Sequence, residues 1–296
     1  MAPSLELCTE DQQLLAQVTI VIVTFNSAHC IESLSQSLGD CPHVVVTDNG
    51  SQDQTHEELA HRIPRARIIS LEDNVGFGAA NNRALATVTT PYALLLNPDC
   101  VIKTTSILAL VRTARNWPEA AMVVPQIQDS REKATINYGW PRPQWKSRGP
   151  GANGLTCVGN ACGAVMLLNL GRMTASDWFD TRFFLYYEDE DLCLRLFNKQ
   201  MSILLEPGIR VTHINRGSVR GRRPLYLEYL RGLHHARSKI LFTAKHYGSP
   251  AACRHRRSAL ALACLTLIAR LLLPSPRLIA RLWGRIRGLL DAPTRY

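Results

Sequence analysis

Residues 18–27 read VTIVIVTFNS, and this stretch decides the fold class. Its first six residues are all β-branched, without the polar alternation of a half-exposed strand. A continuous run of this kind is typical of a strand that is covered on both faces, as in a parallel sheet. Short polar residues follow the run at once and mark the end of the strand.

The same pattern recurs along the first hundred residues. The expected strands are residues 18–23, 44–47, 67–71 and 92–96, and helical segments separate them at 31–38, 57–62 and 79–87. This alternation predicts an α/β fold with a doubly wound, mostly parallel sheet flanked by helices. Ligands of such folds bind beyond the carboxyl ends of the strands. Further along, we expect a helix at residues 107–116, a strand at 120–124 and a long surface loop at 129–154.

Polar residues follow each of the four strands. They are Thr24 and Asn26, then Asp48, Asn49 and Ser51, then Asn74 and Gly76, and finally Asn97 and Asp99. Each alone is an ordinary turn residue, since Asn, Asp, Gly and Ser dominate turns. Four such groups at one edge of a sheet predict a shared ligand crevice.

Two kinds of nucleotide site are excluded by the loops. A dinucleotide site needs G-x-G-x-x-G directly after the first strand, and residues 24–28 contain no glycine. The G-x-G at residues 76–78 follows the third strand and lacks the third glycine. The sequence contains no Walker A loop either.

A second informative stretch, residues 183–195, reads FFLYYEDEDLCLR. Five apolar or aromatic residues lead into four consecutive acids at residues 188–191. A helix N-terminus accounts for one or two of them, because acids there complement the helix dipole. Carboxylates at the mouth of a buried segment also suit a general base whose pKa is raised. We expect a functional role for this run.

The net charge of +10 is unevenly distributed over the 296 residues. Residues 1–209 carry 16 Lys and Arg against 22 Asp and Glu, whereas residues 210–296 carry 18 against 2. A mildly acidic body with a basic tail does not indicate a nucleic-acid-binding protein. The nine cysteines show no C-x-x-C spacing, and residues 1–17 are polar without an apolar signal segment. We therefore expect reduced thiols and a cytoplasmic protein.

The basic tail contains two apolar segments. Residues 258–273 are apolar apart from Ser, Thr and Arg270, but a membrane-spanning helix needs about 20 residues. Residues 276–290 place arginines among regularly spaced apolar residues, which is typical of a helix lying in a membrane interface. We expect residues 221–296 to form a basic amphipathic helical appendage on the cytoplasmic membrane surface. A helical hairpin packed on the body or in a homodimer is the alternative, and RNA binding is disfavoured because aromatic residues are few.

Four motifs give residues 18–215 a specific resemblance to a known family. They are VTFNS at 23–27, VTDNGSQD at 46–53, NVGFGAANN at 74–82 and LLLNPD at 94–99. In this order they resemble the family 2 glycosyltransferases of GT-A fold. The FFLYYED run at 183–189 resembles the rhamnosyltransferase-like branch of that family. The resemblance implies a GT-A domain over residues 18–220, a nucleotide-sugar donor, Mg²⁺ or Mn²⁺ as cofactor, and transfer with inversion.

The resemblance also implies roles for the charged residues. Asp99 is implied as a metal ligand, and His213, after an expected strand at residues 203–211, as a second one. The family often has Asp-x-Asp where this chain has Asn97-Pro98-Asp99, so one carboxylate is missing. Asp189, the second acid of the run, is implied as the general base.

The residues expected around the donor are Thr24, Asn26, Asp48, Asn49, Ser51, Asn74, Gly76, Asn82 and Asn97. Asp48 is expected to bond the base or ribose, and Asn82 to line the approach to the diphosphate. The family often has glycine two residues after Asn82, where this chain has Ala84. The residues expected to contact the acceptor, cap the helix or compete as base are Glu188, Glu190 and Asp191. Trp140 is expected either to stack on a sugar or to pack against the body.

The expected reaction moves L-rhamnose from dTDP-L-rhamnose to a hydroxyl of a lipid-linked glycan in O-antigen or cell-wall assembly. Galactofuranosyl or hexosaminyl transfer from a UDP-sugar stays open. A catalytically silent membrane-surface scaffold also stays open, because Asp-x-Asp is missing. A nucleotidyltransferase is the third alternative, although the glycine-rich basic loop it needs after the first strand is not in the sequence.

Overall fold

A computed structural model describes residues 8–136, 138–139, 151–214, 223–272 and 275–296. Residue contacts divide the chain into two compact units. The sheet unit takes residues 1–75, 79–179 and 192–220. The helical unit takes residues 76–78, 180–191 and 221–296.

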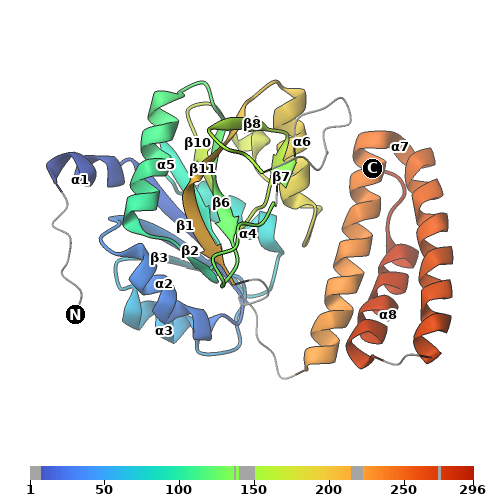
Figure 1. The fold of residues 1–296 in the computed structure, drawn as a ribbon. Helices are drawn as coiled ribbons and strands as arrows, with labels where there is room; N and C mark the ends of the chain where they lie inside the picture. The colour runs from blue at the N-terminus through green and yellow to red at the C-terminus, as the bar shows by residue number, and fades with distance from the viewer. Residues whose placement is uncertain (1–7, 137, 140–150, 215–222, 273–274) are drawn as a thin grey trace. The chain divides into compact units, whose positions relative to one another are not determined.

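A nine-stranded sheet forms the centre of the sheet unit (Figure 1). Its strands follow the order β3-β2-β1-β4-β10-β6-β11-β5, and β8 pairs with β11 off this path. The strands are β1 (Val18–Thr24), β2 (His43–Asp48), β3 (Arg67–Ser70), β4 (Tyr92–Leu96), β5 (Cys100–Val101), β6 (Met122–Gln128), β8 (Thr156–Val158), β10 (Val165–Asn169) and β11 (Ile203–His213). A separate pair joins β7 (Tyr138–Gly139) to β9 (Asn160–Ala161).

Parallel pairing joins β3, β2, β1 and β4, so their carboxyl ends meet at one edge. This confirms the predicted doubly wound α/β sheet and its first four strands. β10 is antiparallel to both β4 and β6. The sequence did not predict this direction, because an apolar run such as VMLLN looks the same in either orientation.

Helices cover the strands and explain why the strands lack polar alternation. They are α1 (Thr9–Leu15), α2 (Ile31–Leu38), α3 (Thr55–Arg62), α4 (Phe77–Leu85), α5 (Thr104–Asn116) and α6 (Glu188–Asn198), with short 3₁₀ turns at Ala28–Cys30 and Ala175–Asp177. Every residue of β1 and β4 is buried. Helix α5 packs against β6 and β11 and adds Ile107, Leu108 and Val111 to the core (Figure 1).

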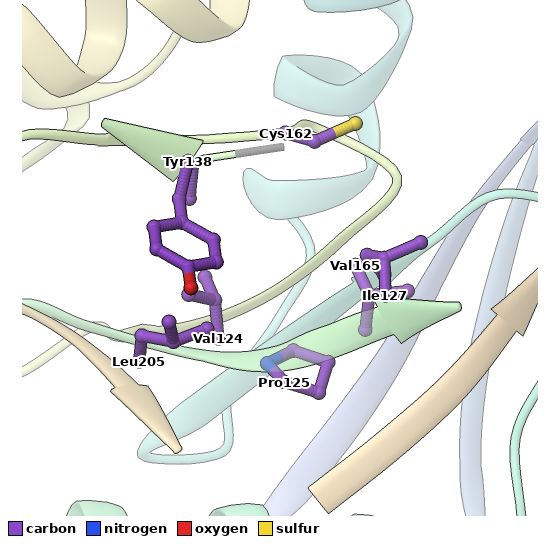
Figure 2. Close-up of a pocket in the computed structure, with 8 residues that line it drawn as sticks. Val124, Pro125, Ile127, Tyr138, Cys162, Val165 and Leu205 are labelled. Atoms are coloured by element: carbon purple, nitrogen blue, oxygen red, sulfur yellow. The ribbon is translucent and has the colours of Figure 1, made fainter. Parts of the chain in front are cut away.

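A small apolar gap remains beside β6 (Figure 2). Val124 and Ile127 of β6, Tyr138 of β7 and Val165 of β10 contribute to its lining. It has no room for a water molecule, so it is a packing defect and not a ligand site. Part of the expected loop at residues 129–154, including Trp140 and Trp145, lies outside the described residues.

Two long helices make up most of the helical unit, α7 (Pro224–Leu272) and α8 (Pro276–Asp291). The predicted C-terminal helical appendage is thereby confirmed. Helix α7 breaks into two arms at Gly248, whose φ of 83° and ψ of 163° are not helical. The two arms and α8 share a small core that includes Ile240, Ala252 and Leu289. Within the described part of the chain, no helix has both the length and the apolar character needed to cross a membrane.

Glycines bring the backbones of α7 and α8 into direct contact. A Cβ atom at Gly284 would lie 1.9 Å from the carbonyl oxygen of Tyr229, and one at Gly288 would lie 2.2 Å from that of Leu233. Any side chain at these two positions would force the helices apart. One face of α8 therefore packs against α7 within a helical hairpin.

Candidate active site

The carboxylate of Asp48 organises the ends of the first two strands. Thr24 is its register partner across β1 and β2 and donates its hydroxyl to Asp48 Oδ1 at 3.0 Å. The Ser51 hydroxyl donates to the same oxygen. Asp48 is only 5% exposed, so these hydroxyls take the place of water as its donors.

Asn26 joins this cluster from the loop after β1. Its backbone N–H donates to Ser51 Oγ at 2.9 Å, and its side-chain oxygen accepts from the Gln52 N–H at 2.8 Å. Its φ of 51° lies in the left-handed region, which Asn tolerates better than most residues. Asn26 therefore fixes the loop that follows β2.

Two amides couple the loops after β2 and β3. Asn49 Nδ2 donates to Asn74 Oδ1 at 2.9 Å, and Asn49 Oδ1 accepts from the Val75 N–H at 2.9 Å. Both groups of the buried Asn49 carboxamide are therefore engaged. The structure thus brings the predicted residues of the second and third loops together at the carboxyl edge of the sheet.

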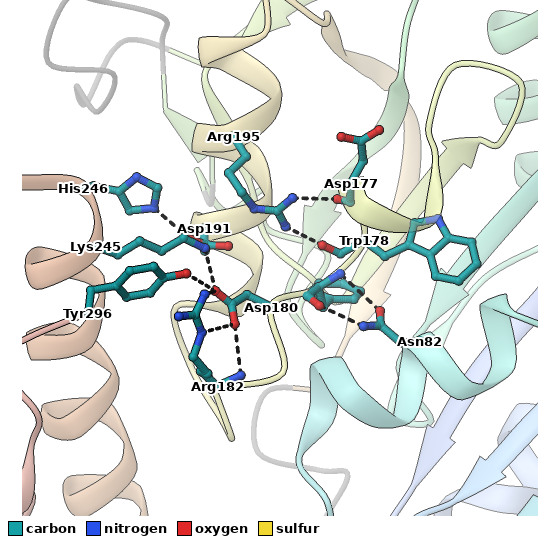
Figure 3. Close-up of polar contacts among 11 residues, drawn as sticks. Asn82, Asp177, Trp178, Asp180, Arg182, Asp191, Arg195, Lys245, His246 and Tyr296 are labelled. Atoms are coloured by element: carbon teal, nitrogen blue, oxygen red, sulfur yellow. Dashed lines mark hydrogen bonds and ion pairs between the residues drawn. The ribbon is translucent and has the colours of Figure 1, made fainter.

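Asn82 and Asn97 have different surroundings. The Asn82 amide donates to the Phe179 carbonyl at 2.8 Å and its oxygen accepts from the Phe179 N–H at 3.1 Å (Figure 3). This clamp was not predicted, and it uses both groups that were expected to face the donor. Asn97 is half-buried at the end of β4, where its backbone N–H donates to the Ala164 carbonyl at 2.9 Å.

Strand pairing forces Asp99 and His213 together. His213 ends β11 and pairs with Cys100 of the antiparallel strand β5, while the Ile214 N–H donates to the Asp99 carbonyl at 3.0 Å. His213 Nε2 lies 3.3 Å from Asp99 Oδ1. Neighbouring ligand atoms around one Mg²⁺ or Mn²⁺ lie about 3 Å apart, so this pair fits a divalent cation.

Cys100 belongs to the same cluster but does not suit the same cation. Burial raises the pKa of its thiol well above the usual value, and the neighbouring Asp99 raises it further. A metal binds the thiolate form, whereas the Cys100 thiol donates to the Ala164 carbonyl at 3.7 Å. The remaining donors are a carboxylate and an imidazole, which favours Mg²⁺ or Mn²⁺ over thiolate-bound metals.

In the helical unit, the apolar run before the acids forms a strained turn. Tyr186 and Tyr187 both have a φ of 68°, and a left-handed conformation costs roughly 1–2 kcal/mol for each non-glycine residue. The Phe184 carbonyl accepts from the Phe77 N–H at 3.0 Å. A Cβ atom on Gly76 would lie 2.4 Å from that carbonyl oxygen, so Gly76 has a packing role that its sequence motif did not reveal. Strain of this kind clusters at functional sites.

The four acids form the first turn of α6, and their environments differ. Burial raises the pKa of the Glu188 carboxyl well above its usual value, and the charge of Asp189 raises it further. Glu188 Oε2 finds no hydrogen-bond partner among the described residues. Asp189 and Glu190 are half-buried, and Asp189 Oδ1 accepts from the Glu190 N–H at 2.8 Å.

Asp191 is fully buried and forms a charged network with α7 (Figure 3). Its Oδ1 lies 2.6 Å from Lys245 Nζ and 2.8 Å from His246 Nε2. This acid is therefore an internal ion-pair partner, a role that the sequence did not predict.

A family model assigns the chain to a known protein family. The model of the glycosyl transferase family 2 matches residues 19–167, half of the chain. The chain belongs to this family. It is a glycosyltransferase of GT-A fold, as its strand-end motifs predicted.

Individual relatives support a rhamnosyltransferase-like glycosyltransferase. An N-acetylglucosaminyl-diphospho-decaprenol L-rhamnosyltransferase from Mycobacterium tuberculosis is 27% identical over 271 residues, covering 77% of this chain and 85% of the relative. A low-salt glycan biosynthesis hexosyltransferase from Haloferax volcanii is 26% identical over 209 residues, 66% of each chain. A mannosyltransferase from Pyrobaculum calidifontis, solved with GDP-Man and Mn²⁺, has a TM-score of 0.54 at 16% identity over 95% of this chain and 90% of its own. That last likeness concerns the fold alone.

Sequence reasoning missed the partners of Asp191 in this glycosyltransferase. His246 lies 55 residues after Asp191, within the basic tail that charge counting assigned to a membrane surface. A Lys-His pair inside a helix does not alter the spacing of the apolar residues, so the sequence pattern does not reveal it. Trp140, the expected sugar-stacking residue, lies outside the described residues.

We expect Glu188→Gln to stabilise the glycosyltransferase at neutral pH. The pKa of Glu188 is higher in the folded protein than in the unfolded chain. As pH rises above about 4.3, the unfolded chain loses this proton before the folded protein does, so the free energy of unfolding falls. The loss reaches about 1.4 kcal/mol per pH unit until the folded pKa is passed. Thermal unfolding between pH 4 and pH 8 should show a midpoint advantage of the variant that grows with pH.

The matched control is Glu57→Gln, which removes an exposed acid from the first turn of α3. Its unfolding midpoint should follow that of the wild type at every pH. If the unfolding midpoints of Glu188→Gln and wild type differ by the same amount at every pH from 4 to 8, Glu188 does not titrate with a raised pKa.

Proposed function

We propose that this glycosyltransferase moves L-rhamnose from dTDP-L-rhamnose to a hydroxyl of a lipid-linked glycan during cell-surface polysaccharide assembly. The observation that carries the proposal is the similarity, over 77% of the chain, to a relative whose name specifies L-rhamnosyl transfer and a diphospho-decaprenol acceptor. The sheet edge supports a nucleotide-sugar site of the kind that such a reaction needs.

The strand ends would hold the nucleotide. The Asp48 carboxylate can only accept hydrogen bonds, so it would receive one from a base N–H or a ribose hydroxyl. Thr24 and Ser51 already donate to one of its oxygens, and this fixes the orientation of the carboxylate before the donor arrives. Asn49 and Asn74 would keep the neighbouring loops in place.

Asp99 and His213 would hold Mg²⁺ or Mn²⁺. When bound, the cation neutralises the charge that develops on the leaving diphosphate. The Asp99 carboxylate would supply a hard oxygen ligand, and the His213 imidazole would supply a second ligand where the first acid of Asp-x-Asp is missing. Asn97 provides a polar but uncharged neighbour in the position of that acid.

Asp189 would act as the general base that takes the proton of the acceptor hydroxyl as its oxygen attacks the anomeric carbon. Its half-buried carboxylate is held by the Glu190 N–H through one oxygen. Burial raises the pKa of the neighbouring Glu188 carboxyl, but Glu188 is only 6% exposed. Access to the acceptor therefore favours Asp189.

The assay that tests the proposal measures nucleoside diphosphate release with Mn²⁺ or Mg²⁺ and a polyprenyl-diphosphate N-acetylglucosamine acceptor. The donors are dTDP-L-rhamnose, UDP-galactofuranose and UDP-N-acetylglucosamine. Acceptor-dependent dTDP release is the expected result. Release from a UDP-sugar alone would transfer the assignment to that donor, and no release from any donor would favour the silent scaffold. Pyrophosphate release in a parallel reaction with a nucleoside triphosphate and a sugar 1-phosphate would indicate a nucleotidyltransferase.

Asp189→Asn should abolish turnover, because the amide cannot accept the proton at pH 7. We expect a loss of at least about 10²-fold in kcat, with dTDP binding in the presence of Mn²⁺ unchanged by calorimetry. Glu190→Gln, which makes the same change one residue later, should retain more activity than Asp189→Asn. Equal turnover of Asp189→Asn and wild type would remove Asp189 from the role of base.

His213→Ala should raise the Mn²⁺ concentration needed for half-maximal activity by at least about 10-fold, the usual scale for a lost metal-site contact. His61→Ala, at an exposed position of α3, is the control and should leave the titration unchanged. A Mn²⁺ titration of His213→Ala that overlays the wild-type curve would exclude His213 as a ligand.

We also propose that the helical unit lies on the cytoplasmic face of the membrane. Leu262, Leu265 and Ile268 share one face of the second arm of α7 and are each at least 60% exposed. Arg254, Arg256 and Arg257 precede them on the same arm, and apolar and cationic residues together favour anionic lipid surfaces. A homodimer that covers this face is the competing interpretation.

Replacing Leu262, Leu265 and Ile268 by Ser should abolish flotation with vesicles of phosphatidylglycerol and phosphatidylethanolamine. Leu225→Ser, at an exposed leucine near the start of α7, should float as the wild type does. If wild-type protein stays in the soluble fraction and sediments as a dimer that the triple substitution dissociates, the dimer interpretation replaces the membrane one.

A further inference from the structure

Lys245 joins the two ends of residues 180–191, which we call the acidic turn (Figure 3). Its Nζ lies 2.7 Å from Asp180 Oδ2 and 2.6 Å from Asp191 Oδ1. The Lys245 side chain is 12% exposed, and those of the two acids are 11% and 0% exposed. One ammonium group therefore closes residues 180–191 into a loop.

Asp180 is held by two further groups. Arg182 donates to it through Nε and one terminal nitrogen, each at 2.9 Å, and the Tyr296 hydroxyl donates at 2.7 Å. The Arg182 guanidinium also lies 3.7 Å from the centre of the Tyr296 ring. Although burial raises the pKa of Asp180, hydrogen bonds from Lys245 and Arg182 bring it below the usual value, so the carboxylate stays charged at neutral pH.

The first arm of α7 also contacts the middle of the turn. Ser238 Oγ donates to the Leu185 carbonyl at 2.8 Å. The His234 ring stacks on Phe184 with centroids 4.6 Å apart. Phe242 packs against Tyr187 at 5.4 Å. Successive turns of one helix therefore hold the turn at its ends and at its centre.

This support acts on the segment that carries the proposed base. The first N–H groups of a helix lack intrahelical acceptors, and first turns fray readily. Asp189 lies between the strained Tyr187 and the anchored Asp191. If Asp191 were released, the first turn of α6 would be free to unwind and relieve the strain of the two tyrosines.

We infer that Lys245 and His246 are positioning residues for Asp189. Helix α7 would then hold the acidic turn in its active conformation, in addition to offering the proposed membrane surface. The inference rests on the proposed role of Asp189 as general base. It requires that loss of either contact lowers kcat while nucleotide binding at the sheet edge is unaffected. A helix that only stabilised the fold would instead lower the amount of active enzyme and leave the kcat of the folded fraction unchanged.

The test compares Lys245→Met with Arg237→Met. Both remove one cation from the same helix, and Arg237 is exposed. Lys245→Met should lower kcat about 10²-fold, the scale expected for a catalytic group displaced by about 1 Å. Its Kd for dTDP with Mn²⁺ should stay within a factor of three of the wild type. Arg237→Met should match the wild type in both.

His246 supplies the second variant pair if Lys245→Met does not fold. His246→Ala removes the donor to Asp191 and should lower kcat at least 10-fold, whereas His246→Gln, which keeps an N–H donor, should recover most of that loss. Equal kcat values for wild type, His246→Ala and His246→Gln, or for Lys245→Met and Arg237→Met, would overturn the inference. If wild-type enzyme releases dTDP but Asp189→Asn does so equally well, it is the assignment of the base that fails.

Discussion

Asp191 is a carboxylate without access to water. Lys245 is its ion-pair partner, and His246 Nε2 lies within hydrogen-bond distance of it. A buried ion pair adds little net stability, but removing one partner costs roughly 3–5 kcal/mol, because the other charge is left unpaired. Residues 188–191 therefore depend on α7 for their conformation. The two left-handed tyrosines before them depend on it too, since their strain persists only while neighbouring contacts fix both ends of the turn.

The sheet edge is built on a different principle. Asp48 is satisfied by hydroxyls from its own and the neighbouring strand end, and Asn49 by the loop that follows β3. The separation of Asp99 and His213 is set by backbone pairing between β5 and β11. Contacts within the protein itself thus fix these side chains, which is the preorganisation that a nucleotide-sugar transferase requires. The sheet edge is therefore fixed by hydrogen bonds from hydroxyl and amide groups, and the acidic turn by a buried ion pair.

Much of the fold could be predicted from the sequence, because a strand buried on both faces leaves an unbroken apolar run. The strand-end residues followed from the same pattern, and His213 from a family resemblance together with an expected strand. The sequence could not show contacts between residues that are far apart along the chain and belong to no repeating pattern, such as Lys245 with Asp191. The packing role of Gly76 and the clamp between Asn82 and Phe179 were hidden for another reason. Both residues also fit a ligand-binding motif, and only backbone proximity reveals their structural contacts.

Hydrogen–deuterium exchange of peptides that cover residues 183–195 tests most directly whether α7 holds the acidic turn. Wild-type protein should protect the amides of this segment, and Lys245→Met should increase their exchange rate at least about 10-fold, while peptides of β1 and β4 stay unchanged. Arg237→Met should exchange as the wild type does. Unchanged protection of residues 183–195 in folded Lys245→Met would contradict the account, because the turn would then keep its shape without its buried charge partner.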